Sequence, residues 1–428
     1  MNSRASWSSS SSLYRCCKPL SILCSASWAC RQVAVVGRGV TSCLVLLLCL
    51  ILSGACWAQG EASWDGQLFQ DSIRAQLEEL DLGQLLRFAE LLDEDYQELI
   101  PSLNWRDLLA GAPAPQSAGD LFLLLFRSFL GELRVSFSLL RQLVVIGILA
   151  ALLQRLSSSF GSRMVVDLAF AVCFLVLVYL GLQSFRVAAG VAQEAVGSMV
   201  EFMHSLLPML STLLVAVGGV TSAAVFHPLL WALVSLTASL VQRLLLPLIL
   251  LSTAFSLVSH FSSELAFPKI GSLLRQAVIT ILGVMFIVFS GFMVVRGAVA
   301  PIADGISLRT AKYLTKTFIP IAGSMFADTL EVVVGGSLLI KNAVGVFGLV
   351  MILCLVAAPL IKVLAMVFVY KVVGALLQPL CDRRVVQTLE TMESSLVLVM
   401  IALGTAALMF FLAVTVLVGI GNLAVFMR

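Results

Sequence analysis

Eight apolar stretches, most of them long enough to cross a bilayer as a helix, recur between residues 140 and 421. The hydrocarbon core of a bilayer is about 30 Å thick, and about 20 apolar residues in a helix span it. This pattern predicts an all-α fold, a polytopic helical membrane protein with about eight transmembrane helices. The expected spans are 140–156, 164–182, 206–226, 228–258, 276–295, 332–357, 359–380 and 395–421.

Composition supports the same class. Hydrophobic residues make up 60% of the 428 residues and charged residues 12%, against about 45–50% and about 25% in a typical soluble domain. So few charges cannot cover the surface of a water-soluble fold of this size, which excludes a soluble globular enzyme. The net charge of only +3 argues against a nucleic-acid binder.

The N-terminal region resembles an export signal. Residues 1–39 are rich in serine and contain five basic residues and no acid. The short apolar run 40–52 and a small-residue break ending at Ala58 follow, the arrangement of a cleavable signal. We therefore predict three parts: a targeting segment (1–58), an acidic extracytoplasmic segment with a linker (59–119), and a helical membrane domain (120–428). An uncleaved N-terminal anchor is the alternative for the first part.

The acidic segment holds 12 of the 24 acidic residues and only three basic ones. Within it, residues 65–109 are expected to form short amphipathic helices, because leucines recur at helical spacing between acidic residues over 82–99. The segment is either a solvated helical cap or a docking surface for extracytoplasmic partners. Residues 120–139, apolar but interrupted by Arg127, Glu132 and Arg134, are expected to lie as an interfacial helix on the outer face.

Loop charges give an expected orientation. With residue 59 outside, the loops 157–163, 296–318 and 381–394 all fall on the cytoplasmic side. The loop 296–318 is the most basic of these, and cytoplasmic loops are enriched in Lys and Arg.

A few ionisable or polar residues lie in or beside the spans, where a charge is costly and needs a partner, a wet cavity or an interface position. They are candidates for a polar pathway or an intersubunit contact, with Lys341 or Lys362 paired to a carboxylate; interfacial snorkelling and structural pairing are the alternative. The candidates are Asp328, Glu331, Lys341, Asn342, Lys362 and Arg243.

Glycines in the spans are candidates for close helix packing, because small residues let membrane helices approach each other. They are Gly335, Gly336, Gly345, Gly218 and Gly219.

Motifs for catalysis or cofactor binding are missing from the sequence. The three histidines are far apart and match no metal-binding pattern, and there is no phosphate-binding loop of the type GxxxxGK[ST]. We therefore expect no enzyme activity, no catalytic residue, no metal and no cofactor.

Several sequence blocks in the C-terminal half, in one order, resemble the stage III sporulation protein AE family. The first two run from Ile319 to Asp328 (IPIAGSMFAD) and from Val334 to Gly345 (VGGSLLIKNAVG). The others are APLIK at 358–362, Gln378-Pro379 followed by Asp382, and Phe410-Phe411 leading to Gly421-Asn422. The resemblance is strong over 300–425 and looser over 120–300.

This resemblance implies a multi-pass membrane protein of the outer forespore membrane, derived from the mother cell, with residues 59–119 outside the cytoplasm. It implies a subunit of a secretion-like channel complex between mother cell and forespore, needed for late forespore development. The implied partners are other membrane subunits and ring-forming subunits of that complex and the lipid bilayer, with a homo-oligomer as one arrangement. The alternative function is a stand-alone secondary transporter for a small solute.

Overall fold

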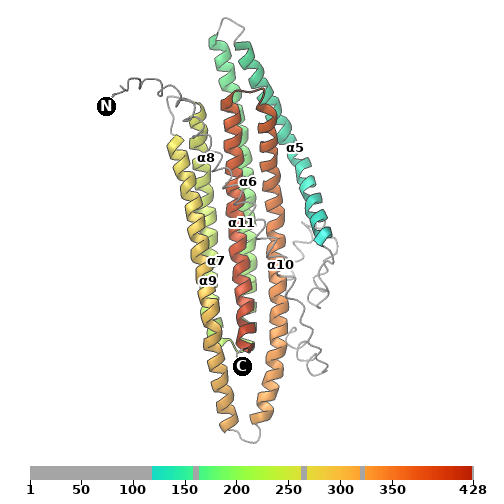
Figure 1. Cartoon of the computed structure of the whole chain (residues 1–428), viewed down its shortest axis with the longest axis vertical. Helices are drawn as coiled ribbons and strands as arrows, with labels where there is room; N and C mark the ends of the chain where they lie inside the picture. Colours follow the sequence, from blue (N-terminus) through green and yellow to red (C-terminus); the bar gives the residue numbers. More distant parts are fainter. Residues whose placement is uncertain (1–117, 158–162, 262–267, 319–322, 427–428) are drawn as a thin grey trace, which may run out of the picture. The chain divides into compact units, whose positions relative to one another are not determined.

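The computed structural model describes residues 118–157, 163–261, 268–318 and 323–426, and every element in these ranges is helical (Figure 1). The predicted targeting segment and the acidic segment up to residue 117 lie outside the described residues. The elements are α5 (Ala118–Ser157), α6 (Arg163–Ala216), α7 (Val220–Ser239), the π-helix η2 (Leu240–Leu245), α8 (Leu246–Phe261), α9 (Pro268–Phe318), α10 (Gly323–Leu377) and α11 (Arg383–Phe426).

The helices are much longer than the expected spans. The 55 residues of α10 and the 54 of α6 correspond to about 80 Å each at about 1.5 Å per residue, whereas the hydrocarbon core is about 30 Å thick. Six stretches of the described residues are long and apolar enough to cross a membrane. The predicted all-helical membrane class is therefore confirmed, and the predicted number of eight spans is not.

The predicted and observed numbers of spans differ because several short segments of low hydropathy contain polar residues or prolines but are not the ends of helices. The predicted spans 332–357 and 359–380 lie on the single helix α10, which continues through Pro359. The predicted interfacial helix 120–139 and span 140–156 likewise form one helix, α5. Continuous helix keeps the backbone groups bonded within the segment, which lipid demands.

The continuity of α10 also corrects the expected orientation. The predicted loop 296–318 is the C-terminal part of α9, next to the start of α10, whereas the loop 381–394 follows the end of α10. One uninterrupted helix of this length separates the two segments, so they lie at opposite ends of the bundle (Figure 1). The basic residues of both segments therefore cannot all face the cytoplasm.

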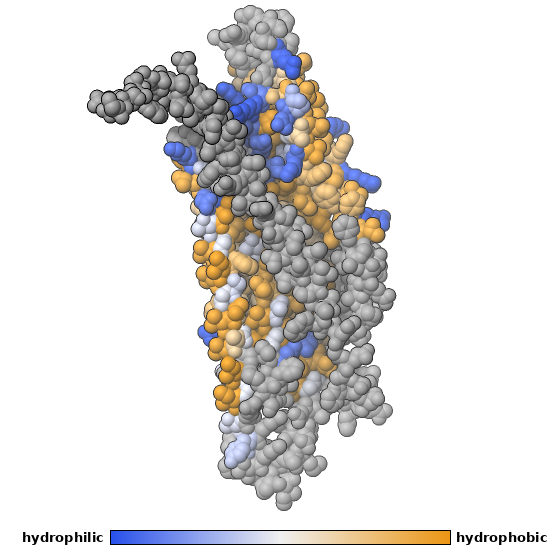
Figure 2. Space-filling model, in the orientation of Figure 1, coloured by the Kyte–Doolittle hydropathy of each residue, from blue (hydrophilic) through white to orange (hydrophobic). Residues whose placement is uncertain are grey.

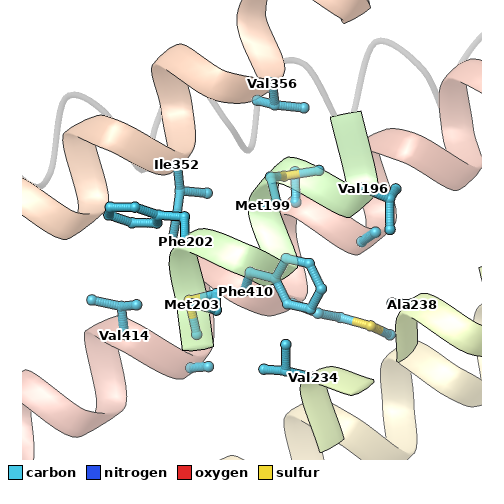
Figure 3. Close-up of a cluster of buried hydrophobic side chains, with 14 of the residues drawn as sticks. Val196, Met199, Phe202, Met203, Val234, Ala238, Ile352, Val356, Phe410 and Val414 are labelled. Carbon is cyan, nitrogen blue, oxygen red and sulfur yellow. The ribbon is translucent and has the colours of Figure 1, made fainter. Parts of the chain in front are cut away.

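Helix α11 forms the centre of the bundle. Its most apolar stretch is 89% buried within the protein, against 22–56% for the other five candidate spans, and it contacts α6, α7, α8, α9 and α10. Figure 3 shows how α6, α7, α10 and α11 interlock through buried side chains such as Phe202, Val234, Ile352 and Phe410. The outer helices present apolar surface instead, and orange patches extend over much of the visible described face in Figure 2.

Candidate functional site: buried polar contacts between helices

Lys341 is completely enclosed by the protein. It lies on α10, none of its surface is exposed, and its Nζ donates a 2.6 Å hydrogen bond to the backbone carbonyl of Val418 on α11. No carboxylate lies within ion-pair distance of Lys341 among the described residues. The partner is therefore a carbonyl on the central helix, and the predicted pairing of Lys341 with a carboxylate is not seen in this part of the chain.

Two asparagines lie close to this contact in the sequence of the two helices. Asn342 is the neighbour of Lys341, and Asn422 lies one helical turn beyond Val418 on α11. The side-chain Oδ1 atoms of both are buried without a hydrogen-bond partner among the described residues. A buried amide oxygen without a donor is costly, so such groups often mark a functional position. The sequence pointed to Asn342 but not to Asn422, which entered only through the family resemblance.

Gly345 explains why α10 and α11 come close at this point. A Cβ atom on Gly345 would lie 2.1 Å from Cγ2 of Val418, far inside van der Waals contact. One turn further on, α10 also approaches α6 closely at another glycine. A Cβ atom on Gly348 would lie 2.6 Å from Leu206. Lys341 and Gly345, predicted separately, thus lie at one contact, because both meet Val418 of α11.

The other predicted glycines differ in role. A Cβ atom on Gly335 would have no neighbour within 4 Å, so this position is not a tight packing contact within the described structure. Gly336 is buried on the same helix. Gly218 and Gly219 do not lie within a span as predicted. They form the turn between α6 and α7, where Gly218 has φ 98°, a conformation that glycine adopts readily and other residues rarely.

Arg243 is exposed on the π-helix η2 rather than buried in the bundle. Pro247 lies four residues further on, in α8, and has no N–H to donate to the carbonyl of Arg243. A π-helix is rare and mostly occurs as a single turn inside an α-helix, as η2 does between α7 and α8. Around Gln242, Arg243 and Pro247 the expected span 228–258 therefore changes helix type without an interruption of the helical segment.

The remaining predicted residues lie elsewhere on α10. Lys362 is partly exposed and has no ion-pair partner among the described residues. Asp328 and Glu331 belong to the first turns of α10, and their side chains lie outside the described residues. Lys341 and Asn342 are neighbours in the sequence, and Lys362 lies about six turns further along the same helix.

A buried carboxylate at Asp304 was not predicted as a site residue. Asp304 lies on α9 and is 0% exposed; its carboxylate accepts hydrogen bonds from the backbone N–H of Ser222, at 3.2 Å, and from the Ser222 hydroxyl. Ser222 lies in the first turn of α7, where backbone N–H groups lack intrahelical partners and the helix dipole favours negative charge. Asp304 thus caps α7 from another helix.

A second layer of polar contacts joins α8, α9 and α11. Arg275 on α9 donates a 2.9 Å hydrogen bond to Ser394, and Thr253 on α8 donates a 2.7 Å hydrogen bond to Ser395. Hydroxyl and guanidinium groups bound across helices in this way hold membrane helices in register. The nearby ion pair of Lys371 and Glu393, at 3.5 Å, is largely exposed on the lysine side and adds little.

Two histidines lie between α6 and α7 and bind hydroxyl groups. Nε2 of His204 lies 3.2 Å from Ser235 Oγ, and its ring stacks on Trp231; Nδ1 of His227 lies 3.3 Å from Ser211 Oγ. Within the described ranges, no group of three or more His, Cys, Asp or Glu residues could hold a metal ion. The polar groups that the described structure brings together thus join helices to one another.

Comparison with known proteins gives one consistent result. The model of the family described as stage III sporulation protein AE matches residues 108–421. A curated relative, stage III sporulation protein AE of Bacillus subtilis (strain 168), is 39% identical over 304 residues, which are 71% of this chain and 76% of the relative. No solved structure matches. The matched range includes all the polar contacts described above except Asn422, which lies one residue beyond it.

Proposed function

Because the chain belongs to the stage III sporulation protein AE family, we propose that it is an integral membrane subunit of a secretion-like channel complex between mother cell and forespore. The observation that carries this proposal is the extent of the family match. It covers nearly all of the described helical bundle, from before α5 to the last turns of α11. The proposed role is to support late forespore development as part of this assembly, without enzymatic activity.

The proposed location is the outer forespore membrane, with residues 59–119 on the side away from the mother-cell cytoplasm. Six stretches able to cross a membrane support an integral position. In the proposed complex, the lipid bilayer and other subunits, both membrane-embedded and ring-forming, would cover the outer apolar faces.

The bundle is suited to a scaffolding role. Helix α11 is enclosed by five other helices, and polar contacts join it to α8, α9 and α10. The outer helices keep long apolar faces, as on α9, where Ile287 is 69% and Val294 68% exposed. A firm centre with free outer faces fits a subunit that contacts lipid and neighbouring subunits at once, including further copies of itself.

The alternative, a stand-alone secondary transporter, is favoured by one observation. Lys341 and the side-chain oxygens of Asn342 and Asn422 are buried polar groups on the neighbouring helices α10 and α11, and intramembrane polar groups often mark transport pathways. The two functions differ in what they require. A transporter acting alone would need residues such as Lys341 but could lose residues 59–119, whereas a channel subunit would need surfaces that bind other proteins.

Affinity purification from sporulating cells separates the two functions. The full chain would be tagged, solubilised in a mild detergent and purified, and co-purifying proteins would be identified by mass spectrometry. The channel proposal predicts that several sporulation-specific membrane and ring-forming proteins co-purify in fixed proportion. Recovery of the tagged chain by itself, under conditions that preserve other membrane complexes of the same cells, would support the transporter.

A further inference from the structure

Helix α6 has a polar outer face in the middle of its length. Six residues are exposed between 183 and 205, and all but one of them are polar or charged. At about 100° of rotation per residue, the six lie within about a third of the helix circumference. They are Gln183, Arg186, Val187, Gln193, Glu194 and Glu201. We name this stripe, over residues 183–205, the α6 polar face.

The depth of the bilayer can be read from α9. Arg275 and Arg296 flank 20 residues that include no Asp, Glu, Lys or Arg. As a helix these residues extend over about 30 Å, which is the thickness of the hydrocarbon core. The exposed side chains in this stretch are large and apolar, such as Ile287 (69%) and Val288 (63%). Residues 276–295 of α9 therefore mark the depth of the hydrocarbon core.

Contacts with the central helix relate this depth to α11. At one end of the charge-free stretch of α9, Arg275 donates a hydrogen bond to Ser394 of α11. At the other end, a Cβ atom on Gly297 would lie 3.0 Å from Val416. The charge-free stretch of α9 therefore runs beside residues 395–415 of α11.

The α6 polar face runs beside the same part of α11. Two residues before the face, a Cβ atom on Gly181 would lie 2.6 Å from Met392 of α11. Just after the face, Leu206 meets α10 at Gly348, about one turn from the contact of α10 with Val418 of α11. The α6 polar face thus lies at the depth of the hydrocarbon core, on a different side of the bundle from the apolar face of α9.

The neighbouring π-helix η2 adds polar groups at this depth. Nε2 of Gln242 donates a 3.1 Å hydrogen bond to the carbonyl oxygen of Gln193, and the next residue, Arg243, is exposed. Arg243 therefore lies near the level of Glu194, halfway along the α6 polar face. Four exposed charged residues have no ion-pair partner among the described residues. They are Arg186, Glu194, Glu201 and Arg243.

Lipid is a poor cover for these charges. Glu194 is 11 residues from either end of the α6 polar face, or about 16 Å, so its short side chain cannot reach the headgroups. Charged residues at membrane depth almost always pair with one another, face the interior of a bundle or face a water-filled cavity. The described structure excludes pairing within the chain and excludes the bundle interior for these residues. Water is the remaining cover.

We propose that the α6 polar face, together with Gln242 and Arg243, lines a water-filled passage for hydrophilic solutes across the membrane. The passage runs along the outside of the bundle, because side chains such as Phe202, Met203 and Phe410 fill its centre. The inference rests on the proposed function, because further subunits of the assembly must close the passage opposite α6.

Cysteine accessibility in membranes tests the passage. In a tagged full-length chain whose native cysteines are replaced by serine, Ser198→Cys and Glu201→Cys place a thiol on the α6 polar face. Ile287→Cys and Val288→Cys are matched controls at the same depth on α9. A charged methanethiosulfonate is applied to open membrane fragments, whose two sides are both accessible. Because such a reagent needs water and a thiolate, the two α6 variants should react at least about ten times faster than the two α9 variants.

Two outcomes of this labelling would overturn the proposal. Reaction of the α6 variants as slow as that of the α9 variants would mean that lipid or protein covers the α6 polar face. Equally fast reaction of all four would mean that this depth lies outside the hydrocarbon core. Partners are identified in the same tagged preparation. Slow reaction with the partners present refutes the passage and leaves the proposed channel complex standing. Fast reaction without partners supports a wetted face and counts against that complex.

The charge preference of the labelling tests the role of the two glutamates. Ser198 lies four residues after Glu194 and three before Glu201, so both carboxylates are its neighbours on the helix surface. The ratio of the rates with a cationic and an anionic methanethiosulfonate at Ser198→Cys should fall several-fold on addition of E194Q/E201Q. Glu390→Gln, an exposed carboxylate near the start of α11, is the control and should leave the ratio unchanged. A ratio that does not respond to E194Q/E201Q would contradict the placement of these carboxylates in the passage.

Discussion

The ammonium group of Lys341 on α10 lies 2.6 Å from the backbone carbonyl oxygen of Val418 on α11, inside the bundle and away from solvent. A charged donor strengthens a hydrogen bond, and a low-dielectric surrounding strengthens it further. The same surrounding makes the lysine costly to bury, so a purely structural contact could be replaced by an apolar side chain of similar size with little loss. Lys341 is therefore a candidate for a functional role rather than a purely stabilising one.

Replacement of Lys341 should separate its contribution to function from its contribution to stability. Lys341→Met keeps most of the volume and removes the charge, so the stability of the detergent-solubilised bundle should change by only about 1 kcal/mol. Lys341→Ala also leaves a cavity and should cost about 2–5 kcal/mol. Both variants should insert into the membrane, and both should lower spore yield. Wild-type spore yield in the Lys341→Met strain would show that the lysine has only a structural role.

The close approach at Gly345 should not tolerate a side chain. In Gly345→Ala the new methyl group would meet Val418 at 2.1 Å, and forced overpacking typically costs about 1–3 kcal/mol. Thermal unfolding in detergent measures the loss. Gly335→Ala is the matched control on the same helix, because its methyl group would meet nothing within 4 Å and alanine has the higher helix propensity. Equal effects of the two substitutions would contradict the packing role, and Val418→Ala should partly rescue Gly345→Ala.

The candidate site was only partly predictable from the sequence. Lys341 and Asn342 were found because a charge or an amide within an apolar run is costly and therefore conspicuous. Their neighbours were not, because the partner of Lys341 is a backbone carbonyl 77 residues away, and every residue type has such a carbonyl. Asp304 was overlooked because it was assigned to a loop, where a carboxylate is unremarkable; its partner Ser222 is 82 residues distant.

The fold, like the site, was only partly predictable from the sequence. Composition and the length of the apolar runs were sufficient to predict a helical membrane protein, because both follow directly from the thickness of the bilayer. Helix ends were not predictable in this way. Pro208 and Pro359 both lie inside continuous helices, and neighbouring helices can satisfy the backbone groups that a proline frees in a membrane bundle. A short segment of lower hydropathy at such a proline therefore did not mark the end of a helix.

Asp304 should stabilise the start of α7 from its position on α9. Asp304→Asn keeps an oxygen that can accept from the N–H of Ser222 but loses the charge that faces the helix dipole, whereas Asp304→Ala loses both. We expect the free energy of unfolding to fall by about 1 kcal/mol in the asparagine variant and by about 2 kcal/mol in the alanine variant. A double-mutant cycle with Ser222→Ala, followed by thermal unfolding, measures the coupling. Additive effects of the two substitutions would show that the Ser222 hydroxyl does not contribute to the contact with Asp304.

Cys381, in the turn between α10 and α11, should react slowly with thiol reagents. Burial raises the pKa of its thiol, and the nearby negative charge of Asp382 raises it further, so less thiolate is present at pH 8 than for an ordinary exposed cysteine. Its Sγ also donates to the carbonyl of Gly147 at 3.2 Å. In a background with the other cysteines replaced by serine, Asp382→Asn should speed maleimide labelling at pH 8, because loss of the charge lowers the pKa. An unchanged rate would show that the carboxylate does not act on the thiol.

Deletion of residues 65–109 should weaken assembly of the proposed channel complex without preventing insertion of the bundle. The core cluster of the described residues lies in helices α6 to α11, so the shortened chain keeps the contacts of that cluster. The acidic segment is the largest region of the chain that is expected to lie outside both lipid and cytoplasm, where extracytoplasmic partners can reach it.

Co-purification of other sporulation proteins with the shortened and the full-length tagged chain, normalised to the amount of chain in the membrane, measures the effect. A control deletion within the N-terminal serine-rich region, residues 1–39, should instead impair export, so the amount of membrane-inserted chain distinguishes the two deletions. Undiminished co-purification with the shortened chain would mean that partners bind the membrane bundle directly, and that the acidic segment serves the chain that carries it.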